Sequence, residues 1–159
     1  VGLERINIKL QIGSREISDK DNSNGIDIEN IKMRLYRIKK YTSKPCAILT
    51  NTTTINIPEV YESLLKFDIV VPSLDAVNND IFKAVNLPEK SINTENIISY
   101  LEKFSKEYKG KLYIEILFCK NINDSENHIK ELINVLKNIK YDKMQKDKKR
   151  TDTKLSKEK

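Results

Sequence analysis

Residues 44–75, with the sequence KPCAILTNTTTINIPEVYESLLKFDIVVPSLD, decide the fold class of this chain. Two short apolar runs, Cys46 to Leu49 and Ile69 to Val71, stand on either side of a polar loop and a helical segment. Pro58 opens that helix, because proline lacks only an N–H that would be unpaired at a helix start. Short, unbroken apolar runs are typical of parallel strands covered on both faces. The stretch therefore predicts a strand–helix–strand unit.

The alternation of strands and helices continues on both sides of this unit. Alternating apolar and polar residues from Arg5 to Ile12 predict a strand with one wet face, followed by a turn at Gly13–Glu16. Helical patterns are expected at about 27–40, at 80–85, from Thr94 and from Asp124 or Ser125; strands are expected at 112–118 and from about 143. Strands that alternate with helices imply right-handed crossovers, so we predict an α/β fold with a parallel sheet.

Two parallel architectures fit this pattern. A flavodoxin-like layered sheet, acting as a non-catalytic binding or interaction module, would be complete at 159 residues. A partial (β/α) barrel is the other architecture, since a complete eightfold barrel needs about 250 residues. Composition does not separate the two. In both, ligands bind beyond the carboxyl ends of the strands, so the polar residues there are the candidates for function.

The net charge of +6 belongs mostly to the end of the chain, since residues 146–159 carry seven basic and three acidic side chains. We expect a folded domain over residues 1–145 and a disordered basic tail over 146–159, a candidate for weak RNA contact. No apolar run approaches the roughly 20 residues that cross a bilayer. We therefore expect no membrane partner and a cytoplasmic location.

The sequence Leu49-Thr50-Asn51, followed one strand later by Ser73-Leu74-Asp75-Ala76, resembles the middle of a radical S-adenosylmethionine (SAM) enzyme barrel. The resemblance is to the stand-alone iron–sulfur oxidoreductases, which are related to tRNA-modifying enzymes, and it covers about residues 4–145. It favours the open, partial barrel, with about four to five βα units. It also implies that SAM is the cofactor.

The resemblance assigns the first of the SAM-contacting segments to Gly13-Ser14-Arg15-Glu16-Ile17, where the family has Gly-Ser-Gly-Glu-Pro. In the family this motif holds the amino group of SAM, which implies cofactor-binding roles for Gly13, Ser14 and Glu16. Arg15 replaces a glycine that permits close backbone approach. An ordinary strand-ending turn is the alternative reading of this segment.

Further candidates follow the later strands. Asn51 matches a family position that is followed by glycine, where this chain has Thr52; its side chain would bind a ligand or cap its own turn. The resemblance places Ser73 and Asp75 beside the ribose of SAM. It also makes Lys120 a cofactor-binding candidate in Lys-Asn-Ile-Asn-Asp, where the family has Lys-Gly-Ile-Asn-Asp.

The family's radical chemistry needs a [4Fe–4S] cluster held by a CxxxCxxC loop, which is absent from this sequence. Cys46 and Cys119 lie in apolar strands and are expected to be buried thiols. We therefore predict that this chain alone is inactive, as a fragment, a decayed gene product or a pseudoenzyme. The strand at residues 6–12 would then be an uncovered edge that pairs with a second copy or with a missing N-terminal segment.

Two other titratable side chains, a carboxylate and an imidazole, lie in predicted elements. Glu115 is expected on one face of its strand with Tyr113 and Leu117, in a salt bridge to a neighbouring strand. The single histidine, His128, falls in the first turn of the last helix, where a surface position without a catalytic role is expected.

Overall fold

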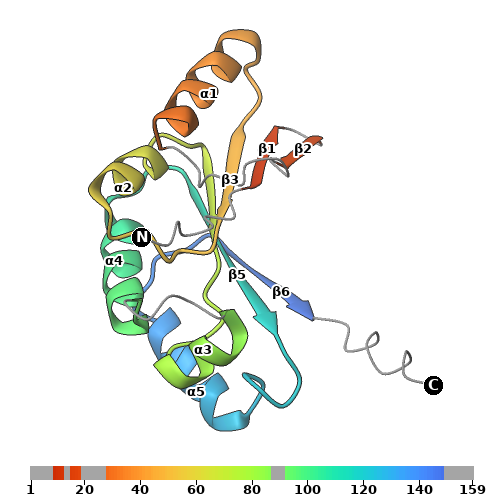
Figure 1. The fold of residues 1–159 in the computed structure, drawn as a ribbon, viewed down its shortest axis with the longest axis vertical. Coiled ribbons are helices and arrows are strands. Elements are labelled where there is room, and N and C mark those ends of the chain that lie inside the picture. The colour runs from red at the N-terminus through yellow and green to blue at the C-terminus, as the bar shows by residue number, and fades with distance from the viewer. Residues whose placement is uncertain (1–8, 13–14, 19–27, 87–91, 149–159) are drawn as a thin grey trace, which may run out of the picture.

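Four parallel strands follow one another in chain order across the centre of the molecule (Figure 1). They are β3 (Cys46–Thr50), β4 (Ile69–Pro72), β5 (Lys111–Phe118) and β6 (Lys143–Lys148). The structure, a computed structural model, describes residues 9–12, 15–18, 28–86 and 92–148. Within these residues each strand pairs in parallel with the next. The predicted α/β fold is confirmed.

The helices that connect the strands begin close to the predicted positions. They are α1 (Ile28–Tyr41), α2 (Pro58–Leu64), α3 (Asn79–Asn86), α4 (Thr94–Glu107) and α5 (Glu126–Leu136). Side-chain caps explain where two of them start, because an N-cap oxygen pairs with a backbone N–H that has no partner inside the helix. Asn93 caps α4 and Ser125 caps α5 in this way.

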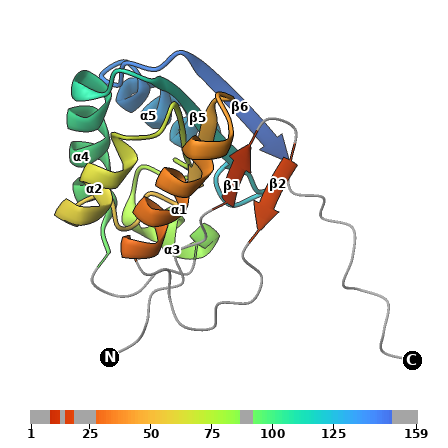
Figure 2. The same cartoon turned by 90° about the horizontal axis from the view of Figure 1, so that it is seen from above.

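The helices gather on one side of the sheet, as Figures 1 and 2 show from two directions. The burial of β5 agrees: Leu112, Ile114 and Ile116 are buried, whereas the alternate residues Tyr113, Glu115 and Leu117 are half-buried. A flavodoxin-like sheet reverses its strand order at a switch point. The order β3-β4-β5-β6 has no such reversal, and it is the order that neighbouring strands of a βα barrel have.

The first two strands correct the sequence-based prediction. The strands β1 (Lys9–Ile12) and β2 (Arg15–Ser18) form an antiparallel pair, and β1 is also antiparallel to β3. The turn expected at Gly13–Glu16 is therefore wrong for Arg15 and Glu16, which are in β2. Only two residues separate β1 from β2, too few for the crossover that parallel strands need. The parallel sheet is confined to β3–β6.

Because of this pairing, β2 and not β1 is the outermost described strand at this end of the sheet. Because β1 has β2 on one side and β3 on the other, the uncovered edge expected at residues 6–12 is wrong for Lys9–Ile12, and residues 6–8 lie outside the described residues. At the other end of the sheet, β6 extends to Lys148, three residues past the expected domain boundary at 145. The rest of the expected tail also lies outside the described residues.

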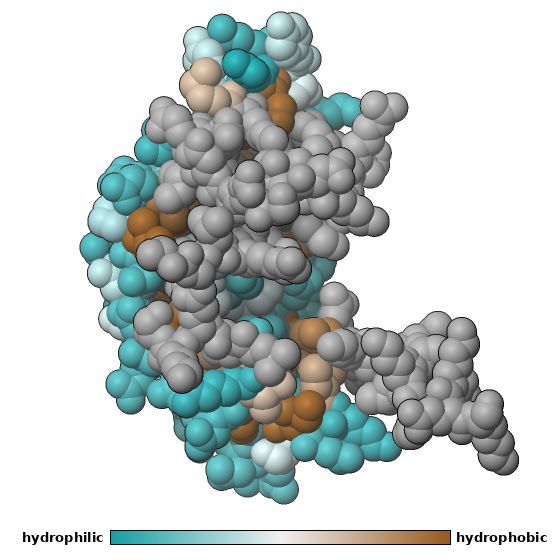
Figure 3. Space-filling model, in the orientation of Figure 1, coloured by the Kyte–Doolittle hydropathy of each residue, from teal (hydrophilic) through white to brown (hydrophobic). Residues whose placement is uncertain are grey.

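The main hydrophobic core lies between the sheet and the helices. Leu101 and Phe104 of α4 are completely buried in it, and the Phe104 ring stacks on Tyr108 with 4.8 Å between the ring centroids. The outer surface of the helices is largely hydrophilic (Figure 3). None of the helices in the described ranges has the length and apolar character of a transmembrane segment.

Two aspartates fasten the amino ends of the strands. The carboxylate of Asp68 accepts hydrogen bonds from the backbone N–H of Cys46 at 2.8 Å and from the Lys39 ammonium at 2.9 Å. Asp142 accepts from the backbone N–H of Leu112 at 2.9 Å. The amino ends of these strands are therefore held by structural contacts.

Candidate functional site

The candidate site is the rim formed by the residues that follow β3, β4 and β5, namely 51–54, 73–76 and 119–124. Since these strands are parallel, their carboxyl ends lie at one edge of the sheet. Direct hydrogen bonds link the three segments: one from Thr52 to Ser73 and one from Asn123 to Asp75. The rim is thus one connected structure.

Thr52 joins the end of β3 to the end of β4. Its hydroxyl donates a 2.8 Å hydrogen bond to the backbone oxygen of Ser73, and the N–H of Ser73 donates to the oxygen of Thr50 at 2.9 Å. Thr52 is buried and has a φ of 68°, in the left-handed region that disfavours residues with a Cβ by about 1–2 kcal/mol. The hydroxyl contact and the burial hold this unfavourable conformation in place.

Asn51 caps its own turn, which is one of the two roles considered for it. Its side-chain oxygen accepts hydrogen bonds from the backbone N–H of Thr53 at 3.3 Å and from the Thr53 hydroxyl at 2.9 Å. This arrangement is the local side-chain-to-backbone turn that asparagine favours. The side chain of Asn51 is half-buried, so part of it remains at the surface of the rim.

Ser73 connects β4 to β5. Its half-buried hydroxyl donates to the Glu115 carboxylate at 3.4 Å, and the backbone N–H of Leu74 donates to the backbone oxygen of Glu115 at 2.9 Å. Glu115 lies in the half-buried row with Tyr113 and Leu117, as predicted, on the side of the sheet away from the helices. A hydroxyl and a carboxylate therefore meet where β4 ends beside β5.

Asp75 is a buried carboxylate that holds the end of β5. One of its oxygens accepts a 2.8 Å hydrogen bond from the backbone N–H of Leu117, and the side chain is only 9% exposed. Burial raises the pKa of Asp75 above its ordinary value, opposed by hydrogen bonds from the Leu117 N–H and the Asn86 side chain. Its contacts within the protein make Asp75 a positioning residue of the rim.

Asn123 completes this network; it belongs to the motif at residues 120–124, in which the family resemblance assigns a binding role to Lys120 alone. It is fully buried, and its amide nitrogen donates to the backbone oxygens of Asp75 and Leu117, each at 2.8 Å. Its side-chain oxygen accepts from the backbone N–H of Cys119 at 2.7 Å. Asn123 therefore ties the loop after β5 to the loop after β4.

Lys120 is exposed on the rim directly after β5. The next residue, Asn121, has a φ of 62°, and its N–H donates to the carboxylate of Asp124 at 2.8 Å. Thr52 and Asn121 are the two non-glycine residues with positive φ in the described part of the chain. These are also the two rim positions at which the family motifs have glycine.

The structure thus brings together only some of the residues expected from the sequence. Asn51, Ser73 and Asp75 belong to one hydrogen-bonded rim, with Lys120 at its β5 end. Glu16 lies in β2 opposite Gln11 of β1, which pairs with Ala47 near the amino end of β3, so Glu16 is two strands away from β3 and does not join the rim. Gly13 and Ser14 lie outside the described residues.

His128 corrects another expectation, because it is buried rather than on the surface. It is 1% exposed, and neither ring nitrogen has a hydrogen-bond partner among the described residues. Its Nδ1 lies 3.9 Å from the carboxylate of Glu131. Its position in the first turn of α5 is covered by tertiary packing that the helical pattern does not encode.

The cysteines do not fit an iron–sulfur cluster. Cys46 begins β3 and Cys119 follows the end of β5, so the two buried thiols lie at opposite edges of the parallel sheet. Burial raises the pKa of the Cys46 thiol, which disfavours the thiolate that binds iron. The described residues hold no group of three metal-ligating side chains. The predicted burial of both cysteines is confirmed.

No protein-family model matches the chain. Over 93 residues it is 40% identical to a UPF0026 protein of Helicobacter pylori, covering 58% of this chain and 30% of that protein. It is 35% identical over 117 residues to a protein named GTPase Obg from Brachyspira hyodysenteriae, covering 74% of this chain and 17% of that protein. It is 40% identical over 65 residues to the dual-specificity RNA methyltransferase RlmN of Wigglesworthia glossinidia brevipalpis, covering 38% of this chain and 17% of that protein.

These relatives define what the chain resembles. It is similar to UPF0026 proteins and more distantly to the RlmN methyltransferases, and it spans less than a third of each of the three relatives described. The sequence contains no Gly-x-x-x-x-Gly-Lys-Ser/Thr phosphate loop, so the part shared with the Obg protein carries no nucleotide-binding motif of that kind.

Proposed function

We propose that this chain is the SAM-binding part of a radical SAM-like domain and does not generate radicals by itself. The candidate pocket is the rim after β3, β4 and β5. Radical chemistry needs an electron from an iron–sulfur cluster, and the cysteines described above lie too far apart in the fold to share one. Binding, rather than turnover, is the activity that the rim supports.

The backbone at Thr52 and Asn121 carries the proposal. A left-handed conformation is the one that glycine adopts without strain, and both residues retain it where the family motifs have glycine. Thr52 keeps this conformation although a β-branched residue disfavours it, and asparagine tolerates it at position 121. Both loops therefore follow the backbone path that glycine would take, which supports the proposal that the rim has the shape of a ligand pocket.

The comparisons support the same class. The RlmN methyltransferases belong to the radical SAM enzymes, and the match to them falls in a chain whose parallel strands run in barrel order. The similarity to the UPF0026 proteins is stronger and covers more of this chain.

Within the proposed pocket, the half-buried Ser73 hydroxyl and Asn51 amide are the groups suited to the ribose hydroxyls of SAM. Asp75 acts through Leu117 by fixing the end of β5, and Lys120 lies exposed at the mouth. Glu16 is not part of the proposed pocket, because the pairing of β2 with β1 and of β1 with β3 places it toward the amino end of β3. Gly13 and Ser14 lie outside the described residues, and their contact to the SAM amino group stays a prediction from the resemblance.

Isothermal titration calorimetry of the full chain with SAM tests the proposal. We expect a single site, and we expect Ser73→Ala to weaken SAM binding at least fivefold, because a hydrogen bond is lost. The matched control is Ser99→Ala, which removes an exposed hydroxyl from α4 and should leave affinity unchanged. Absence of binding heat at millimolar SAM, or an equal loss in both variants, would contradict the proposal.

The second candidate function is a non-catalytic interaction module. It is favoured by the observation that Asn51 and Asp75 already have protein partners for their side-chain oxygens. In that case the rim is a purely structural closure of the strands. A chain that binds no SAM but captures a protein partner would establish this alternative.

A further inference from the structure

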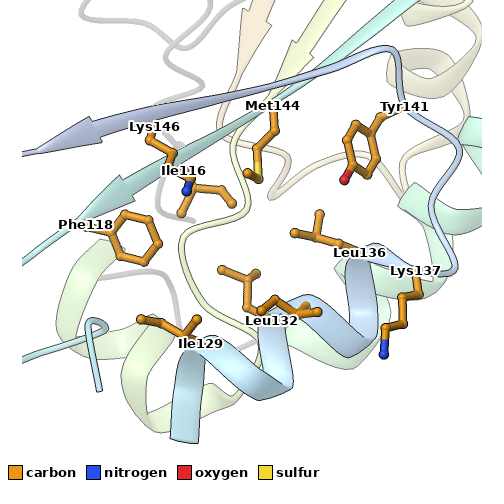
Figure 4. Close-up of a pocket in the computed structure, with 10 residues that line it drawn as sticks. Ile116, Phe118, Ile129, Leu132, Leu136, Lys137, Tyr141, Met144 and Lys146 are labelled. Atoms are coloured by element: carbon orange, nitrogen blue, oxygen red, sulfur yellow. The ribbon is translucent and has the colours of Figure 1, made fainter. Parts of the chain in front are cut away.

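An apolar groove of about 270 Å³ lies between α5 and β6, on the helix-covered side of the sheet (Figure 4). Its floor consists of Ile116 of β5 together with Leu132 and Leu136 of α5, all buried. The side chains of Phe118 and Met144 line its sides. The groove is separate from the rim and has no role in the proposed function.

The place of the groove in the fold favours a helical occupant. Helices α1, α2, α4 and α5 cover the same face of the sheet in succession (Figure 1), and the groove follows α5 at the end of this row. In the described part of the chain, β6 pairs only with β5. An amphipathic helix that lays apolar side chains into the groove would cover α5 and β6 in the way that helices recognise hydrophobic grooves.

The mouth of the groove combines exposed apolar and basic side chains. Ile133 is 48% exposed and Tyr141 is 37% exposed, values high for large apolar residues. Lys137 and Lys146 line the groove on either side. An apolar floor between cationic edges fits an occupant with a row of apolar residues and flanking carboxylates.

Charge argues against two occupants from this chain itself. Residues 149–159 contain five basic and two acidic residues and one large apolar residue, Leu155, so they match neither the floor nor the edges. The exposed apolar residues of α1, Met33 and Tyr36, lie on a helix rich in lysine and arginine. A second copy presenting that helix would bring like charges together.

We propose that the groove between α5 and β6 is a docking site for an acidic amphipathic helix of a partner protein. The apolar floor supplies the contact area, and Lys137 and Lys146 select for acidic flanks. RNA is the less favoured occupant because the buried floor of Ile116, Leu132 and Leu136 offers apolar contact area, which a phosphate backbone does not use.

A fluorescent 18-residue helical peptide with leucines at positions i, i+4, i+7 and i+11 and glutamates on both flanks is the probe. Fluorescence anisotropy with the full chain should give a Kd below 100 μM. Ile133→Glu should weaken binding at least tenfold. The matched control is Met33→Glu, which places the same charge at a residue of similar exposure on α1 and should leave binding unchanged.

Two further probes decide the chemistry of the occupant. The same leucine stripe flanked by lysines should bind at least tenfold more weakly, and Lys137→Glu with Lys146→Glu should reduce that difference. No binding up to 1 mM, equal binding of both peptides, or equal loss in Met33→Glu would overturn the proposal. So would RNA binding lost in the double lysine variant but retained in Ile133→Glu, or a dimer that Ile133→Glu dissociates.

Discussion

The Thr52 hydroxyl donates a 2.8 Å hydrogen bond to the backbone oxygen of Ser73, and Thr52 does so from a left-handed backbone conformation. One residue thereby fixes the distance between the ends of β3 and β4. The contact offsets part of the unfavourable conformation of a β-branched residue at positive φ.

This relationship predicts an unusual order of stability. Thr52→Ala should lower the free energy of unfolding by about 1–3 kcal/mol, because a hydrogen bond and buried atoms are lost. Thr52→Gly should be about 1 kcal/mol more stable than Thr52→Ala, because glycine adopts positive φ without strain. Urea denaturation measures both values.

Ser99 of α4 provides the control pair for this comparison. Ser99 is exposed in a helix, where a glycine variant is less stable than an alanine variant by about 0.5–1 kcal/mol. The order should therefore reverse between Ser99 and Thr52. The same order at both positions would mean that Thr52 does not have a left-handed backbone in solution.

The raised pKa of Asp75 predicts that the folded protein loses stability as the pH rises. Its pKa is raised in the folded protein, chiefly by burial, so the folded state holds the proton more tightly than the unfolded state. The favourable contribution is complete below the unfolded pKa of about 3.9 and disappears as the pH passes through the raised folded pKa. Asp75→Asn keeps an acceptor for the Leu117 N–H and should remove this dependence.

The measurement is the difference in unfolding free energy between the wild type and Asp75→Asn at pH 4 and pH 7. We expect the wild type to lose stability relative to the variant over this interval. Asp75→Ala should be destabilised at both pH values because it leaves the Leu117 N–H without its acceptor. If the free energy of unfolding of the wild type instead rises relative to that of Asp75→Asn between pH 4 and pH 7, the pKa of Asp75 is not raised by burial.

Asp68 predicts the opposite pH dependence at the other edge of the sheet. Burial alone would raise the pKa of Asp68, but the Cys46 N–H and the Lys39 ammonium outweigh it and hold the pKa below its ordinary value. Its contribution is present above the unfolded pKa and is lost as the pH falls through the folded pKa. Asp68→Asn should therefore cost stability at neutral pH and little in acid. Acid titration followed by circular dichroism measures the difference.

The predicted elements rested on local signals that the structure confirms. Asn93 and Ser125 cap helices where the sequence placed helix starts, and the apolar runs of β3 and β4 are buried strands. Capping residues and hydrophobic periods act within a few neighbouring residues, so a single sequence is enough to find them.

The features that the sequence did not predict depend on contacts between distant segments. Nothing in Arg15–Ser18 marks it as a partner of β1, because four residues with mixed polarity do not specify a strand. His128 is buried by tertiary packing, and Asn123 acts through Asp75, 48 positions away. One signal did point to the left-handed backbone of Thr52 and Asn121. The motifs of the family that the sequence resembles have glycine at both positions.

The positions of the cysteines predict the outcome of cluster reconstitution. Anaerobic treatment of the full chain with iron and sulfide should give no stable absorbance near 400 nm, because Cys46 and Cys119 lie at opposite edges of the sheet. Cys46→Ala with Cys119→Ala should give the same spectrum as the wild type. A cluster band in the wild type that the double variant lacks would show that the thiols do meet.

Amide chemical shifts during a SAM titration test most directly whether the carboxyl-end rim of β3, β4 and β5 is a SAM pocket. The N–H signals of residues 51–54, 73–75 and 120–121 should shift together and saturate, whereas those of Asp68 and Asp142 at the opposite edge should stay in place. Unchanged rim signals at millimolar SAM, or shifts confined to the opposite edge, would show that the rim is not a SAM pocket.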